Sequence, residues 1–505
     1  MSLLTARDAW RYIRRYSVTV LGTFLLAACT VGPDYKRPAM QTPAQWRTSD
    51  KDGIDEKVPT ASIDSQAAPG WQVAQPSHAP SVLNWWAPLH DAELDALEQK
   101  AMAASATLQQ AAARYGQARA VVAERSSASL PEIDANGGLS RDKTSEQRPR
   151  LRYEQASEST VQNDVRAGIS ANYEIDLFGR VRRDIESAQA SASQSADDLA
   201  NARLVLSADL ATHYVDLRSL DSELDVLART IDALNHQMDV VNTRHRLGMA
   251  SQVDVLQQQD AVDGARTQLA LLAQRRAQYV DAIAALIGVP APSFNIAPLT
   301  GNALRAPVPL LTLDPGVPST LLQRRPDIAS AERAMAAANA RIGVAKAAYF
   351  PDITLGPQIG WESTRFATMM SAPALLWSIG TNVSQVLFDG GRRRAAVSYA
   401  QQDYLGAEAN YRQSVLDAFR EVQDAVSGLA ALSTAAHRAS DADHDSEQLL
   451  LLARKRYDGG EIAFIDVLDA EQRALNSERQ QIQIRSQQAS LSIFLAKALG
   501  GGWKG

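Results

Sequence analysis

Long parts of this chain have the spacing of apolar residues that is typical of helices. From Gly179 to Arg246 and from Val253 to Ile287, alanine, leucine, glutamine, aspartate and arginine recur without a proline. A helix of sixty-odd residues would be about 100 Å long, because each residue adds 1.5 Å. The narrow apolar seam predicts helices packed side by side in a coiled-coil-like array, with their polar faces outside.

A different pattern, with a period of two, occupies the segment from Val161 to Leu177. Its even-numbered positions are polar or glycine, and its odd-numbered positions are apolar apart from Asn163. This alternation predicts a strand with one apolar and one polar face. A shorter run of the same kind covers 133–139. Such strands occur in transmembrane β-barrels and in half-exposed sheets of soluble domains, and the strands alone favour the soluble sheet.

The order of predicted elements occurs twice. A helix from Asp91 to about Ser129, the two strands above and the long hairpin make the first round. The second round comprises a helix at 326–349, strands at 353–361 and 376–388, and helices at 390–456 and 465–499. This repetition predicts an internal duplication. We expect repeats at 84–288 and 319–500, a proline-rich connector at 289–318 and a tail at 501–505.

Both hairpins bend at related motifs. The second motif spans Arg456 to Asp469, and a near copy spans Arg244 to Leu256, 212 residues earlier. This offset places Gly248 on Gly460. We expect both glycines to end their helices in a left-handed conformation, as helix-capping glycines do.

Composition excludes several classes of function. The chain has 505 residues, a net charge of −6 and no evident basic stripe, so it offers no electrostatic reason to expect nucleic acid. The lone cysteine, Cys29, excludes an intrachain disulfide and is too little for a thiolate metal site. No phosphate-binding glycine loop or nucleophile elbow is evident, so we expect no enzyme. His437 and His444 keep metal-ion efflux open as an alternative.

The N-terminus has the features of an export signal. Four arginines precede a short apolar run at 18–28, which is about half the ~20 residues of a membrane-spanning helix. The sequence L-A-A-C at 26–29 resembles the lipobox of bacterial lipoproteins. The resemblance implies a signal peptide at 1–28 and a mature chain that begins at Cys29, with acyl chains as its covalent lipid. A buried free cysteine is the alternative. We read 29–83 as an extended strap.

Each round supplies two strands, so one chain supplies four. Four strands cannot close a membrane barrel, because the smallest barrels have about eight. Open strand edges are not viable in lipid, so in a membrane other copies of the chain must complete the barrel. Three copies would give twelve strands, although closure alone does not choose between a dimer and a trimer.

Three motifs resemble the signatures of the TolC-like outer membrane efflux protein family. They are L-Q-R-R-P-D-I-A-S-A-E-R with its continuation (322–355), V-L-F-D-G-G-R-R-R-A-A-V (386–397) and A-F-R-E-V-Q-D-A (418–425). The resemblance implies a mainly α, mixed fold. In it, a homotrimer forms a 12-stranded transmembrane β-barrel, with four strands from each chain, that continues as a long periplasmic α-helical barrel. This expectation replaces the soluble sheet favoured by the strands alone.

The same resemblance implies a function and partners. It describes an exit duct of a tripartite efflux pump, lipid-anchored in the outer membrane. Its partners would be a periplasmic adaptor protein and an inner-membrane pump, commonly of the resistance–nodulation–division type. Type I protein secretion uses the same fold and is an alternative. A soluble coiled-coil scaffold is a third reading.

Finally, the resemblance points to residues of a periplasmic gate. Asp466 and Asp469 lie three positions apart, hence on one helix face, and would form two carboxylate rings in a trimer. Asp254 and Tyr457 match positions that help to tether the closed helices, and a hydrogen bond between them is a candidate contact. The alternative is that these acids only stabilise the start of a helix.

Overall fold

The computed structural model describes residues 30–38, 40, 43, 46, 84–143, 161–301, 310–311, 318 and 324–501. The predicted signal peptide, Cys29, most of the strap, part of the connector and all of the tail but Gly501 lie outside these ranges. The chain divides into two compact units. One comprises Met1–Pro38, Tyr115–Ser195 and Ala331–Tyr411, and the other Ala39–Arg114, Ala196–Ser330 and Arg412–Gly505.

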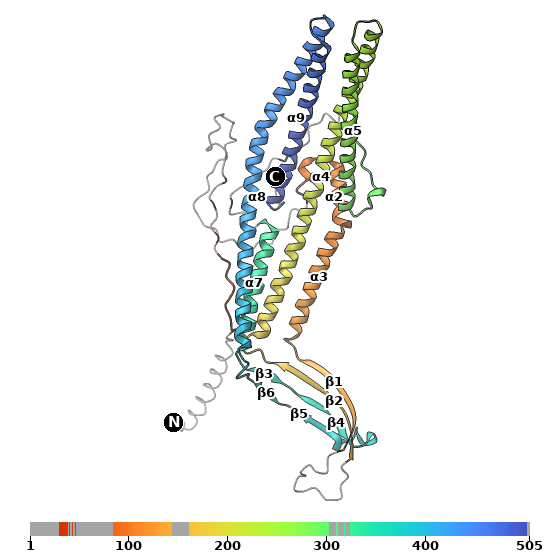
Figure 1. Cartoon of the computed structure of the whole chain (residues 1–505). Coiled ribbons are helices and arrows are strands. Elements are labelled where there is room, and N and C mark those ends of the chain that lie inside the picture. The colour runs from red at the N-terminus through yellow and green to blue at the C-terminus, as the bar shows by residue number, and fades with distance from the viewer. Residues whose placement is uncertain are drawn as a thin grey trace, which may run out of the picture. The chain divides into compact units, whose positions relative to one another are not determined.

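Helices dominate the described ranges (Figure 1). They are α2 (Ala92–Ala104), α3 (Ala106–Ser127), α4 (Arg180–Arg246), α5 (Gln252–Leu286), α7 (Pro326–Ala347), α8 (Arg392–Asp458) and α9 (Phe464–Ala498). Short 3-10 turns lie at η2 (Ala87–Leu89), η3 (Ala291–Ser293), η6 (Phe366–Thr368) and η7 (Ala372–Ala374). No helix in the described ranges has the length and apolarity needed to cross a membrane.

The second half repeats the helix lengths of the first. Both α4 and α8 have 67 residues, both α5 and α9 have 35, and both α3 and α7 have 22. The first residues of α4 and α8, Arg180 and Arg392, are 212 positions apart. The two predicted long hairpins are therefore confirmed, with ends within about two residues of the expected ones.

One helix that was predicted to be continuous is in fact two helices. The segment from Asp91 to Ser129 is split at Ser105 into α2 and α3. Ser105 leaves the helical conformation, with φ −59° and ψ 122°, while its N–H donates to the Ala101 carbonyl. Its own carbonyl accepts from Gln109, so the same residue ends α2 and starts α3. Serine favours this position at a helix start, and the apolar spacing did not show it.

The sheet belongs to the first unit and is antiparallel throughout. Its strands are β1 (Glu132–Lys143), β2 (Val161–Glu174), β3 (Asp352–Leu355), β4 (Gln358–Ser363), β5 (Leu375–Ser378) and β6 (Thr381–Ser384). Along one edge of β2 runs β1, and along the other run β4 and β3; β5 and β6 follow outside them. The six strands thus occupy four side-by-side positions in the sheet, here called lanes, because β3 with β4 and β5 with β6 each share one. The predicted strand at 353–361 is broken at Gly356-Pro357, because proline cannot donate to the ladder, and the predicted strand at 376–388 is broken at Ile379-Gly380 and ends at Ser384.

The registers place the apolar residues of neighbouring strands on one face. Ile169 is opposite Ala135 on β1 and Ile359 on β4, and Ile359 is opposite Trp377 on β5. Side chains of this face remain exposed in the single chain: Ile133, Leu139, Ile169, Ile359, Trp377 and Val383. The sheet therefore presents an apolar surface that no other described part of the chain covers.

Apolar packing in the second unit joins helices that are distant in sequence. One cluster unites Trp85, Trp86 and α2 with the middle of α4 and the ends of α5 and α9. Trp85 also donates its indole N–H to the Ser207 hydroxyl at 2.7 Å. A second cluster runs between α4 and α5 and includes Leu475 of α9. These clusters hold parts of α4, α5 and α9 against one another, and the hairpin ends extend beyond them.

Candidate functional site

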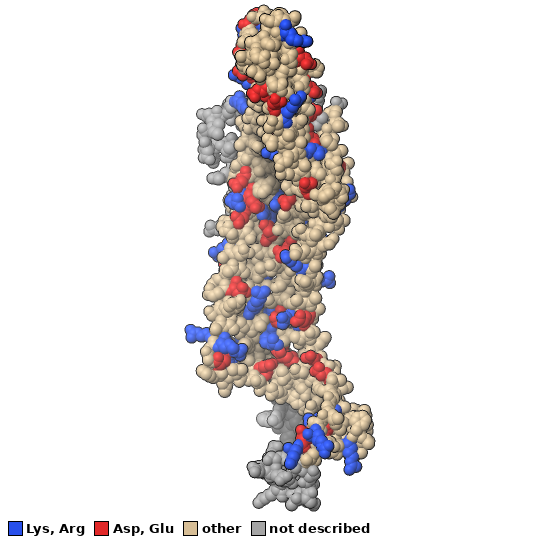
Figure 2. Space-filling model, turned by 45° about the vertical axis from the view of Figure 1, so that its right-hand side comes forward, with Lys and Arg blue, Asp and Glu red and all other residues tan. Residues whose placement is uncertain are grey.

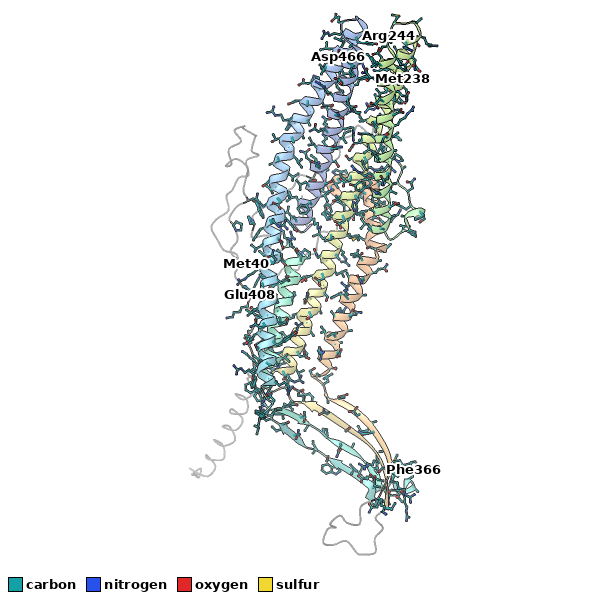
Figure 3. All side chains as sticks on the ribbon, in the orientation of Figure 1. Met40, Met238, Arg244, Phe366, Glu408 and Asp466 are labelled. Carbon is teal, nitrogen blue, oxygen red and sulfur yellow. The ribbon has the colours of Figure 1, made fainter. Side chains whose placement is uncertain are left out.

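The candidate site lies where each long hairpin bends. Arg244 and Asp466 lie near the ends of the two hairpins, both in the second unit (Figure 3). Gly248 and Gly460 adopt left-handed backbones, with φ of 72° and 75°. The residue after each glycine donates its N–H to a carbonyl five positions back, Met249 to Arg244 and Glu461 to Arg456. This arrangement satisfies the last carbonyls of α4 and α8 and turns the chain sharply.

Two of the predicted gate acids are engaged at helix starts. The Asp254 carboxylate accepts from the N–H and the hydroxyl of Ser251, at 2.8 and 2.9 Å. Asp466, its counterpart in the second hairpin, accepts from the Ala463 N–H at 3.0 Å. Both acids thus stabilise the first turn of the returning helix, as the alternative reading of the sequence expected.

Asp469 differs from them. It is exposed, and within the described ranges its side chain forms no hydrogen bond or ion pair. It lies one turn beyond Asp466 on the same face of α9. Its carboxylate is therefore the one available to a neighbouring copy, an ion or a passing solute.

Tyr457 connects the two hairpins through a contact that the sequence did not indicate. The Arg244 guanidinium lies over the Tyr457 ring, 4.7 Å from its centroid, and the ring of Phe464 packs 5.4 Å from that of Tyr457. Asp254 and Tyr457 form no hydrogen bond with each other among the described contacts. The first hairpin is thus joined to the second at this point by a cation–π interaction.

Further along, polar contacts continue between α4 and α9. Asp216 accepts from Ser490 at 2.9 Å, and Glu223 accepts from Gln483 at 3.2 Å. Glu471 accepts from Arg454 of α8 at 2.6 Å and also from Gln237 of α4. The α4 positions 216, 223, 237 and 244 are spaced by multiples of seven, so they lie along one helix stripe. The hairpins therefore meet through hydrogen bonds as well as apolar packing.

The signature motifs come together around one arginine. Arg325 is buried and donates to both carboxylate oxygens of Asp327, to Glu421 at 2.6 Å and to the Ala498 carbonyl at 3.0 Å. Arg325 and Asp327 belong to the first signature, and Glu421 to the A-F-R-E motif of α8. The motif gave Arg325 no predicted role. The structure shows that it ties α7, α8 and α9 together.

Glu98 of α2 is a second residue that sequence reasoning missed. Its side chain is buried, and neither carboxyl oxygen has a hydrogen-bond partner. Burial, with the nearby Asp95 charge, raises the pKa of Glu98 to about 9. Its carboxyl is consequently protonated at neutral pH, which permits it to lie inside an apolar cluster.

The described side chains give no metal site. In the described ranges, no three histidine, cysteine, aspartate or glutamate residues gather to hold a metal. Acidic and basic side chains are interspersed on the face drawn in Figure 2.

Comparisons with known proteins agree across both halves. A family described as "Outer membrane efflux protein" matches residues 97–289 and 317–501. The pyoverdine export outer membrane protein OpmQ of Pseudomonas aeruginosa is 30% identical over 482 residues, which are 95% of each chain. The toluene efflux pump outer membrane protein TtgF of Pseudomonas putida is 28% identical, over 97% of this chain and 98% of that protein.

Solved structures match most of the chain. The outer-membrane channel OprN matches with a TM-score of 0.78 and 26% identity, over 94% of this chain and all of that one. The outer membrane protein VceC of Vibrio cholerae matches with a TM-score of 0.76 and 26% identity, over 85% of this chain and all of that one. The resemblance read from the signature motifs is thereby confirmed.

Proposed function

Since this chain belongs to the outer membrane efflux protein family, we propose that it is the exit duct of a tripartite efflux system. It conducts small toxic compounds passively from an inner-membrane pump and a periplasmic adaptor to the cell exterior. No catalytic step is part of this role.

The observation that carries the proposal is the incomplete sheet. Within the part of the chain that the structure describes, one face is apolar and uncovered. The two outer positions of the sheet, β1 on one side and β5 with β6 on the other, each pair along a single edge there. In lipid such edges must be paired. Three copies, joined through these edges, would close a barrel of twelve lanes with its apolar face toward lipid.

The long helices provide the rest of the duct. With 67 residues each, α4 and α8 are about 100 Å long. In a trimer they would continue the barrel into the periplasm, and the hairpin ends would surround its inner mouth. There we place the gate, with Asp466 and Asp469 as its acidic rings. Asp254 stabilises the first hairpin beside them, and Tyr457 joins the two hairpins.

The hairpin ends are also the place where an adaptor would dock. Leu247, Met249 and Val253 are exposed at the first bend, and Arg456 and Glu461 pair at the second. The inner-membrane pump, commonly of the resistance–nodulation–division type, selects the compounds. Relatives are named for export of pyoverdine and toluene, so we propose small organic molecules as the main cargo.

The lipid anchor on Cys29 remains part of the proposal. Residues 30–38 belong to the first unit and form no helix or strand. Val31 donates to the Phe178 carbonyl at 3.1 Å, and Asp34 pairs with Arg183 at 2.7 Å. The chain directly after Cys29 is thus held where β2 meets α4. An acyl chain there would reach the same membrane that holds the sheet.

Deletion of the gene tests the proposed cargo. We expect lower minimum inhibitory concentrations for organic drugs and greater accumulation of a fluorescent dye, both restored by the unmodified gene. Sensitivity only to metal ions would favour metal-ion efflux, and loss of a secreted protein would favour type I secretion. Unchanged drug sensitivity, dye accumulation, metal tolerance and secretion would contradict the proposal.

A further inference from the structure

The junction between the sheet and α8 exposes apolar and basic side chains together. Leu387 and Phe388 are 90% and 89% exposed, and Val386 beside them is 44% exposed. Arg392 and Arg394, in the first turn of α8, are exposed as well. Within the described residues their guanidinium groups have no hydrogen-bond or ion-pair partner.

The equivalent junction in the first half is built differently. There Arg180 pairs with Glu174, and Arg182 pairs with Asp176 at 3.2 Å. The offset of 212 residues that relates α4 to α8 places Arg392 on Arg180 and Arg394 on Arg182. It also places Val386 and Phe388 on the two acids. The second half thus has arginines at both equivalent positions, but apolar residues where the first half has their carboxylate partners.

The remaining charged groups nearby do not restore those partners. Asp389 forms an ion pair with Arg393, whose Nε lies 2.7 Å from the carboxylate. Arg393 also lies over the ring of Tyr349, which is itself partly exposed. Two guanidinium groups are therefore left beside a projecting apolar segment.

This combination suits a lipid surface. Apolar and aromatic side chains enter the acyl region, while arginines reach the headgroups and bind phosphate with two parallel hydrogen bonds. The segment is also continuous with β6, whose Val383 lies on the exposed apolar face. Both the charge and the apolar surface thus point to one occupant.

We propose that Arg392 and Arg394 bind phospholipid phosphate groups, with Val386, Leu387 and Phe388 inserted among the acyl chains. This site rests on the proposed outer-membrane function. It fixes the depth of the chain in the membrane through the second half only, because the first half satisfies its arginines internally.

Native mass spectrometry of the purified, detergent-solubilised assembly tests the site, with dioctanoyl phosphatidylglycerol as the titrated probe. The double variant Arg392→Gln/Arg394→Gln should bind the lipid about 25-fold more weakly, from about fivefold for each arginine. The matched variant Arg180→Gln/Arg182→Gln should bind it like the unmodified chain, because those arginines are already paired.

A second variant keeps both arginines and supplies the missing acids. Val386→Glu/Phe388→Asp should weaken lipid binding as strongly as loss of the arginines does. Unchanged binding in both double variants would overturn the site. Dissociation of the assembly in Arg392→Gln/Arg394→Gln, with lipid binding per copy unchanged, would also overturn it and assign the arginines to a second copy. Conductance is measured separately, so failure of the duct and failure of the lipid site are distinguishable.

Discussion

Replacement of Arg325 by methionine is expected to lower the free energy of unfolding by about 3–5 kcal/mol, the usual cost of breaking a buried ion-pair network. Methionine keeps much of the side-chain volume and removes the charge. Asp327 and Glu421 then lose their common partner, and the Ala498 carbonyl loses a donor. Because these groups belong to α7, α8 and α9, the loss weakens the packing of three helices at once.

The measurement is guanidinium unfolding of the solubilised protein at fixed concentration, followed by circular dichroism. Arg420→Met is the control, since Arg420 is exposed and pairs at the surface with Asp417 and Asp424. It should cost less than about 1 kcal/mol. Equal effects of the two substitutions would show that the Arg325 network does not hold the helices together.

Replacement of Asp469 by asparagine is expected to weaken the preference of the channel for cations roughly fivefold, which corresponds to about 1 kcal/mol of Coulomb attraction. Among the described residues, Asp469 has no hydrogen-bond or ion-pair partner, so its charge is free to act on a passing ion. The double variant Asp466→Ala/Asp469→Ala should in addition raise the conductance, because it also removes the hydrogen bond from the Ala463 N–H that holds the first turn of α9.

Reversal potentials in a salt gradient measure the ion preference. Asp254→Asn serves as the control, since its carboxylate is occupied by Ser251 in the other hairpin. If the Asp469 variant and the double variant both keep the currents of the unmodified chain, these acids do not form the gate.

Much of the fold could be predicted because its elements are local and long. The period-two run at 161–177 and the proline-free helices are strong patterns, and the duplicated bends identified Gly248 and Gly460. Breaks within helices and strands were harder to predict from the sequence. Ser105 interrupts a helical pattern without changing its apolar spacing, and the strand predicted at 353–361 is broken at Gly356-Pro357, where proline cannot donate to the ladder.

The contacts between distant residues could not be predicted. Arg325 and Glu421 are 96 positions apart, and the Arg244–Tyr457 contact joins two hairpins. No periodicity encodes either pair. The aspartates of the bends were recognised by motif. The motif could not separate Asp466, which caps a helix, from Asp469, which has no partner among the described residues. The sequence shows that Val386 and Phe388 stand where the first half has Glu174 and Asp176. Only the structure shows that these two acids form ion pairs with arginines in the first half.

Single-channel recording from the purified assembly in planar lipid bilayers tests the central claim most directly. If three copies close a barrel through their free strand edges, insertion produces discrete, cation-preferring conductance steps of uniform size. A bilayer that stays silent, although protein is shown to have inserted as an assembly, would contradict the claim that this chain is an outer-membrane duct.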